Sequence, residues 1–135
     1  MSAYREQKTS INDAECLMVA LQGMGYKPQR HAVAIPLIGY TGDTRKQTAE
    51  IVIPRKQVGG ASNDIGFKKA ANGAFNAIIS DYDSHRHGEA WLKDVKMRAL
   101  EAKAMKIAKA QEDLGACTRT VLQSGKIRLQ FTKRG

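Results

Sequence analysis

The sequence predicts a single α+β domain over residues 1–135, with an antiparallel sheet of about five or six strands flanked by two or three helices. Three observations lead to this prediction. Alternating apolar and polar residues mark several short strands, while apolar residues spaced by three and four mark helices. The order strand, helix, two strands occurs twice, as two βαββ-like halves. Such a repeat is typical of an antiparallel sheet with its helices on one face.

The first half predicts one helix among three strands. We expect the strands at residues 4–11, 31–38 and 48–53. The helix begins after Asn12, the expected N-cap, and Glu15 completes a capping box three residues later. Gly25 stands where a left-handed residue commonly ends a helix. In the last of these strands, Ile51 and Ile53 should share the buried face because side chains alternate along a strand.

The second half predicts a short strand, two helices and a C-terminal hairpin. The expected segments are a strand at residues 63–67, a helix through Ala70, Phe75, Ile78 and Ile79, a polar loop at 81–88, a long helix from Glu89 to Leu114, and strands at 117–122 and 127–132. The long helix is rich in basic residues. Its apolar side is expected to form a packed seam, because the positions step by three and four: Met97, Leu100, Ala104, Ile107, Gln111 and Leu114.

Composition indicates a basic, folded protein. The formal net charge is +9 and the pI is about 9.8, so the chain is attracted to polyanions such as nucleic acid or an acidic protein surface. The two cysteines, Cys16 and Cys117, have no CxxC spacing, which favours buried thiols in a reducing compartment. Neither a secretory signal nor an apolar run of membrane-spanning length occurs in the sequence. We therefore expect a cytoplasmic protein without membrane association.

Four separated motifs occur in a characteristic order along the chain. They are KTSINDAECLMVALQGMGY (residues 8–26), GYTGDTRKQTAEIVI (39–53), NDIGF (63–67) and GKIRLQF (125–131). In this order they resemble an uncharacterised family of small proteins known from cyanobacteria, plastid genomes and some large bacteriophages. The resemblance spans nearly the whole chain.

The resemblance implies an accessory or adaptor role. Members of that family are often encoded beside MoxR-type AAA+ ATPases, and the family is a domain of unknown function. It therefore implies no catalytic residues for this chain. An ATPase-type assembly is the partner it implies, or a host complex if the protein is encoded by a phage.

Basic residues are the leading candidates for a binding site. On the long helix they cover a broad arc opposite the apolar seam, at about 100° per residue. Others lie at the ends of the central hairpin and at the end of the chain, and the same residues would neutralise phosphates if the partner were nucleic acid. The candidates are Arg45, Lys46, Arg55, Lys56, Arg98, Lys103, Lys106, Lys109, Lys126, Arg128, Lys133 and Arg134.

The segment DYDSHRH is a weaker candidate for a metal site. Asp81, Asp83, His85 and His87 alternate in it, and on an extended segment they would project to one side. A solvated loop explains the same pattern. Nucleophilic catalysis has less support, because Cys16 lies on the apolar side of the first helix.

We therefore expect a non-enzymatic binding or regulatory protein that needs no cofactor and docks an acidic protein partner. The alternative is a nucleic-acid-binding protein without sequence specificity, since aromatic residues suited to base stacking are scarce. A small metal-dependent enzyme is the more distant alternative. The apolar helix seam and the edge strands also permit a homodimer.

Overall fold

The structure is a computed structural model that describes residues 3–114, 116–121 and 127–132, with side chains described for residues 3–112. The chain divides into two compact units, Met1–Leu100 and Glu101–Gly135, which are described separately below. The expectation of one domain over residues 1–135 accordingly stays a prediction. Within the described residues, no helix is both long and apolar enough to cross a membrane.

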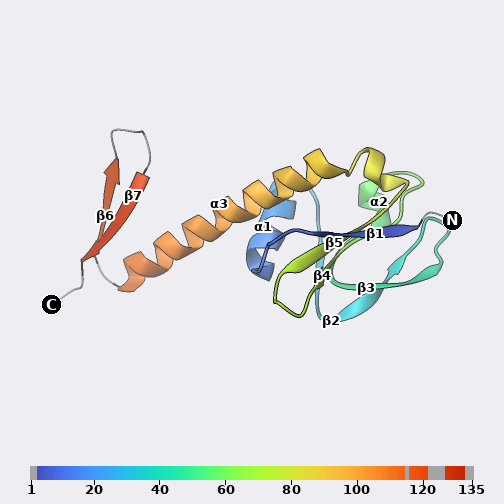
Figure 1. Cartoon of the computed structure of the whole chain (residues 1–135), viewed down its shortest axis with the longest axis horizontal. Helices are drawn as coiled ribbons and strands as arrows, with labels where there is room; N and C mark the ends of the chain where they lie inside the picture. Colours follow the sequence, from blue (N-terminus) through green and yellow to red (C-terminus); the bar gives the residue numbers. More distant parts are fainter. Residues whose placement is uncertain (1–2, 115, 122–126, 133–135) are drawn as a thin grey trace. The chain divides into compact units, whose positions relative to one another are not determined.

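The first unit contains a five-stranded antiparallel sheet with the strand order β1-β5-β4-β3-β2 (Figure 1). This confirms the predicted α+β class. In chain order the elements are β1 (Tyr4–Lys8), α1 (Ala14–Gly23), β2 (Gln29–Ile38), β3 (Thr44–Ile53), α2 (Arg55–Val58), β4 (Ile65–Lys69), β5 (Phe75–Ser80), the 3₁₀ helix η1 (Asp83–His85) and α3 (Glu89–Leu114). The order strand, helix, two strands occurs as β1-α1-β2-β3. The second set begins at β5 rather than at the predicted strand 63–67, includes η1 before α3, and ends in β6 (Ala116–Val121) and β7 (Ile127–Thr132), which form a sheet of their own.

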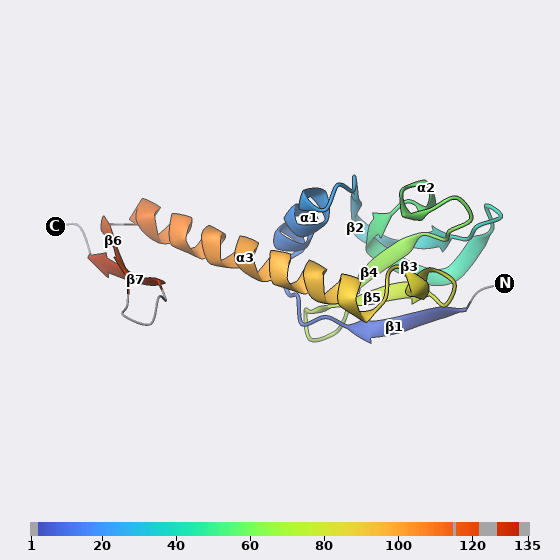
Figure 2. The ribbon, with the colours of Figure 1, turned by 90° about the horizontal axis from the view of Figure 1, so that it is seen from above.

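Helices α1 and α3 cover one face of this sheet (Figure 2). Leu17 and Leu21 of α1 and Val95 of α3 are fully buried there, against strand residues such as Ile51 and Phe67. These side chains form the main core, and their burial supplies most of the stabilisation of the unit. As predicted, Ile51 and Ile53 lie in this core, whereas Val52 between them faces the other side.

On the opposite face of the sheet, the end of the edge strand β2 packs over part of β3 and β5. Leu37 of β2 is fully buried against Ala49 and Val52. A side chain at Gly66 would place its Cβ 2.7 Å from the Cβ of Ala49 and 2.9 Å from Cδ2 of Leu37. Only glycine therefore allows this close packing. The pairing of β2 with β3 is interrupted between Arg30 and Ile35, which is where β2 bends.

The first helix begins and ends close to the predicted positions. Its N-cap is Asp13, whose Oδ1 accepts a hydrogen bond from the backbone N–H of Cys16 at 3.1 Å, rather than the expected Asn12. Both residues are good caps, and sequence alone does not separate neighbours of this kind. Gly25 has a φ of +96°, which confirms the left-handed residue after the helix.

The helix predicted through Ala70 and Phe75 is wrong. The chain instead forms the β4–β5 hairpin, whose turn contains Gly73 with a φ of +86°. The Asn72–Gly73 pair explains the turn, since both residue types favour such backbone conformations. Along β5, Phe75, Ala77 and Ile79 face the main core, whereas Ile78 faces the other side of the sheet. The apolar run therefore belongs to a strand that is buried on both faces.

The packed seam predicted along α3 is also wrong in its position. The side of α3 that enters the core carries Leu92, Val95 and Ala99, whereas Met97 and Leu100 are exposed. At about 100° per residue, the exposed stripe lies roughly 130° around the helix from the buried one. The helix bounds themselves, Glu89–Leu114, are as predicted.

In the second unit, β6 (Ala116–Val121) and β7 (Ile127–Thr132) pair antiparallel as a separate two-stranded sheet. The predicted C-terminal hairpin is thereby confirmed in its strands. The prediction that one of its faces is buried concerns side chains outside the described residues, as does the expected burial of Cys117.

Candidate functional site

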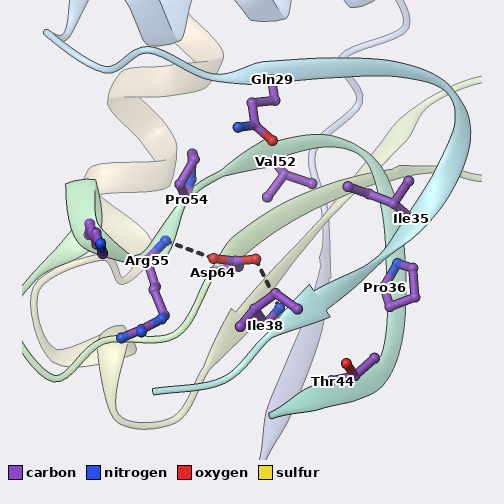
Figure 3. Close-up of a pocket in the computed structure, with 10 residues that line it drawn as sticks. Gln29, Ile35, Pro36, Ile38, Thr44, Val52, Pro54, Arg55 and Asp64 are labelled. Carbon is purple, nitrogen blue, oxygen red and sulfur yellow. Dashed lines mark hydrogen bonds between the residues drawn. The ribbon is translucent and has the colours of Figure 1, made fainter. Parts of the chain in front are cut away.

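An open hollow of about 520 Å³ lies beneath the bend of β2, on the sheet face away from α1 and α3 (Figure 3). Its walls are largely apolar, and side chains from α2 and from the start of β4 complete one end. The lining residues are Gln29, Ile35, Pro36, Ile38, Thr44, Val52, Pro54, Arg55, Lys56 and Asp64. Sequence reasoning did not find this hollow, although Pro36 within a strand was a signal that the strand is irregular.

Asp64 holds the end of this hollow together. One carboxylate oxygen accepts the backbone N–H of Ile38 at 2.9 Å, and the other accepts the backbone N–H of Arg55 at 2.7 Å (Figure 3). The hydroxyl of Tyr4 donates to the main-chain oxygen of Asp64 at 2.8 Å. Burial raises the pKa of the Asp64 carboxyl above its ordinary value, and the two N–H donors oppose that rise. Both oxygens are engaged, so Asp64 has a structural role.

Two of the predicted basic candidates, Arg55 and Lys56, lie at the rim of the hollow. The guanidinium of Arg55 donates through Nη1 to the main-chain oxygen of Tyr40 at 3.2 Å, whereas Lys56 is exposed. Both residues belong to the short helix α2, which sequence reasoning did not predict.

Arg45 and Lys46, which are neighbours in the sequence, differ in their exposure to solvent. The Arg45 side chain is largely buried, stacks over the Tyr4 ring at 5.0 Å and lies 3.9 Å from the carboxylate of Asp43. Cation–π stacking of this kind contributes to stability. Lys46 is exposed. Of the two, only Lys46 presents its charge fully to solvent.

The basic candidates on α3 also differ in role. Arg98 donates through Nε to Asp94 at 3.2 Å and through Nη1 to the main-chain oxygen of Gly23, also at 3.2 Å. Gly23 is the last residue of α1, where a cation also interacts favourably with the helix dipole. Lys106 and Lys109 are exposed, and Lys103 is half-buried. Arg98 therefore joins two helices although it is partly exposed, and Lys106 and Lys109 place further exposed charge along α3.

The remaining basic candidates belong to the C-terminal hairpin. Lys126, Lys133 and Arg134 lie outside the described residues, and the side chain of Arg128 does as well. Their part in a binding site stays a prediction.

The segment from Asp81 to His87 is folded into a turn and the 3₁₀ helix η1 rather than extended. Its four metal candidates consequently point to different surroundings. Asp81 forms an ion pair with Arg5, His85 is exposed, and Asp83 and His87 are buried. In the part of the chain with described side chains, no group of three or more potential ligands is arranged to hold a metal ion.

A buried polar network surrounds Asp83. Its Oδ2 accepts hydrogen bonds from the backbone N–H of Asn63 at 3.0 Å and from the Ser80 hydroxyl at 2.8 Å. The Asn63 side chain in turn donates to the Ser80 hydroxyl oxygen at 2.9 Å and accepts the backbone N–H of Tyr40 at 2.9 Å. The network ties the turn after β2 to the segment before α3. This accounts for the asparagine and aspartate of the NDIGF motif as structural residues.

His87 forms a second cluster with Tyr26 and Trp91. Nε2 of His87 lies 3.2 Å from the Tyr26 hydroxyl, which accepts a hydrogen bond from Nε1 of Trp91 at 3.1 Å. The rings of His87 and Trp91 meet edge to face at 5.0 Å. Burial lowers the pKa of His87, and the nearby Asp83 opposes that effect. The cluster packs the start of α3 against the segment that follows α1.

Comparison of the chain with protein-family models, with curated proteins and with solved structures finds no match. The resemblance described above therefore stays a prediction.

Proposed function

We propose that this protein is a non-enzymatic binding or regulatory protein that docks an acidic protein partner through exposed basic side chains. The observation that carries the proposal is the unequal exposure of acidic and basic groups. Among the described side chains, six of twelve carboxylates are half-buried or buried and bond within the fold, whereas thirteen of seventeen lysines and arginines are exposed. Net positive charge spread over a surface in this way accelerates association with acidic partners.

The half-buried and buried carboxylates all make contacts within the fold. Asp13 caps α1, Asp43 bonds within the turn after β2, and Glu50 accepts the backbone N–H of Lys69. Asp64 holds the end of the hollow, Asp81 pairs with Arg5, and Asp83 accepts the backbone N–H of Asn63. The exposed cations include Arg5, Lys8, Lys27, Arg30, Lys46, Lys56, Lys68, Lys69, Arg86, Lys93, Arg98, Lys106 and Lys109.

The outer part of α3 is the proposed centre of this surface. Lys106 and Lys109 are exposed there. At about 100° per residue, Glu101 lies roughly 140° around the helix from Lys106, whereas Glu112, three residues after Lys109, lies beside Lys109. A protein partner suits the surface better than single-stranded nucleic acid does. Among the side chains of residues 3–112, the clearly exposed aromatic ones are Tyr40 and Tyr82, which lie in separate segments, while base stacking needs neighbouring rings.

The proposal is tested by co-purification from the native cytoplasm, with and without nuclease. We expect a defined protein, such as a component of an ATPase-type assembly, to be retained after nuclease treatment. Charge reversal of Lys106 and Lys109 to glutamate should weaken its binding about tenfold or more, because like charges would then face each other.

The matched control reverses Lys68 and Lys69, two exposed lysines on β4, and should leave binding within about twofold, because these residues do not belong to the proposed surface on α3 and surface substitutions elsewhere have small effects. Loss of the retained material on nuclease treatment would instead support the alternative, a nucleic-acid-binding protein. An equal effect of the two double variants would contradict a site on α3.

A further inference from the structure

Helix α3 carries an apolar stripe on the side opposite the core. Leu100 is 71% exposed, Met97 is 55% exposed and Ile107 is 47% exposed. Large apolar side chains that lie in a row and face solvent mark a surface that another molecule covers.

The outer part of α3 has no buried side chain among the described residues. From residue 100 to residue 112, none of the side chains is buried. Short helices are marginally stable in water, and most helical stability in proteins comes from tertiary packing of an apolar face. This part of α3 would therefore be stabilised by a contact along its apolar stripe.

The spacing of the stripe is that of a coiled coil. Its positions alternate by three and four residues, so they occupy the a and d sites of successive heptads. The a sites are Met97, Ala104 and Gln111, and the d sites are Leu100, Ile107 and Leu114. The stripe used by the core, which includes Leu92, Val95 and Ala99, falls at the c and f sites on the other side of the helix.

We propose that α3 pairs with α3 of a second copy of this chain, as a parallel, in-register two-stranded coiled coil. Charge complementarity selects a second copy. In this heptad register Lys96 is at a g site and Glu101 at the following e site. Parallel pairing places each g residue beside the e residue five positions later on the partner helix, so Lys96 meets Glu101 twice by symmetry. Gln111, a polar residue at an a site, helps to set the register.

An antiparallel pair has the opposite electrostatics. It places g sites beside g sites, so Lys96 and Lys103 of the two copies would meet as like charges. The dimer goes beyond the proposed docking function and is compatible with it. Lys106 and Lys109 occupy c and f sites, which face away from a coiled-coil partner.

The first test is the oligomeric state of the full chain by sedimentation equilibrium over a wide range of concentration. We expect a reversible dimer of twice the 14.8 kDa chain mass. Changing both Leu100 and Ile107 to aspartate should weaken dimerisation by at least about a hundredfold, since each change would place a charge in an apolar seam. Both side chains are exposed in the single chain, so its fold should remain, as circular dichroism would verify.

Met105→Asp is the matched control. Met105 is 74% exposed on the same helix but occupies a b site away from the seam. The control should dimerise within about threefold of the unchanged protein, because surface substitutions have small effects. A monomer at every concentration would overturn the proposal, as would equal weakening by the control.

The second test addresses the orientation of the two helices. Lys96→Glu alone and Glu101→Lys alone should each weaken the dimer several-fold, because each places like charges side by side. The double change should restore affinity to within about twofold, since it exchanges the charges and keeps their attraction. Failure of this restoration would overturn the parallel arrangement. The seam variants keep Lys106 and Lys109, so their binding to an acidic partner reports on the docking function separately.

Discussion

The two ends of helix α3 differ in how they are held. The inner end enters the core through Leu92 and Val95 and is preceded by the buried residues Asp83 and His87. The outer end has no buried side chain between residues 100 and 112. The same helix thus packs one side into the core at its first turns and has exposed side chains further along. Amphipathic spacing alone does not distinguish these two uses.

The largest expected difference between the two ends concerns the core. Leu92→Ala should lower the free energy of unfolding by about 2–5 kcal/mol, because it removes buried methyl groups and leaves a cavity. Leu100→Ala on the exposed side should change it by no more than about 0.5 kcal/mol in dilute protein, where dimerisation contributes little. Urea denaturation measures both. Equal losses would mean that the exposed stripe packs within the single chain.

Loss of the buried polar network should lower the free energy of unfolding by less than a change in the apolar core does, but by a measurable amount. Asp83→Ala leaves the Asn63 N–H groups and the Ser80 hydroxyl without their shared acceptor, which should cost about 1–3 kcal/mol of unfolding free energy. Glu112→Ala is the control at the exposed outer end and should have almost no effect. A silent Asp83 variant would show that this network does not fix the start of α3.

A smaller, pH-dependent effect is expected from His87. Because burial lowers its pKa below the ordinary 6.5, the unfolded chain binds a proton at a higher pH than the folded chain does. Stability should therefore fall as the pH drops from about 6.5 toward the lowered pKa, and should be constant above that range. Thermal denaturation at a series of pH values measures this.

The matched variants are His87→Gln and His85→Gln. The first should reduce the pH dependence of stability, whereas the second should leave it unchanged because His85 is exposed. If both variants behaved like the unchanged protein, another group would be responsible for any acid sensitivity.

Much of the fold could be predicted from sequence, and the failures have identifiable causes. The bounds of α3, the strand character of β3 and the C-terminal hairpin follow from spacing that only one structure type satisfies. The β5 strand was mistaken for a helix because its apolar run is buried on both faces, and such a run lacks the period that separates strands from helices.

The candidate sites were predicted less well, because sequence shows residue types and not their partners. Arg45 and Arg98 are basic residues that the fold uses for internal contacts, and nothing in their sequence neighbourhoods distinguishes them from the exposed Lys109. Asp83 and His87 alternate with Asp81 and His85, yet the 3₁₀ turn places them in different surroundings. The hollow beneath β2 depends on a bend between residues that are far from Asp64 in the chain.

The sequence by itself determined the class of fold, the net positive charge and the apolar spacing from Met97 to Leu114 in α3, since these depend on composition and on local periodicity. Only the tertiary structure decided which side of α3 is buried and which carboxylates are buried or half-buried. The physical reason is that burial depends on contacts between distant segments. A helix with two apolar sides has no local preference for either, and the packing of α1 and the sheet selects the side that carries Leu92, Val95 and Ala99.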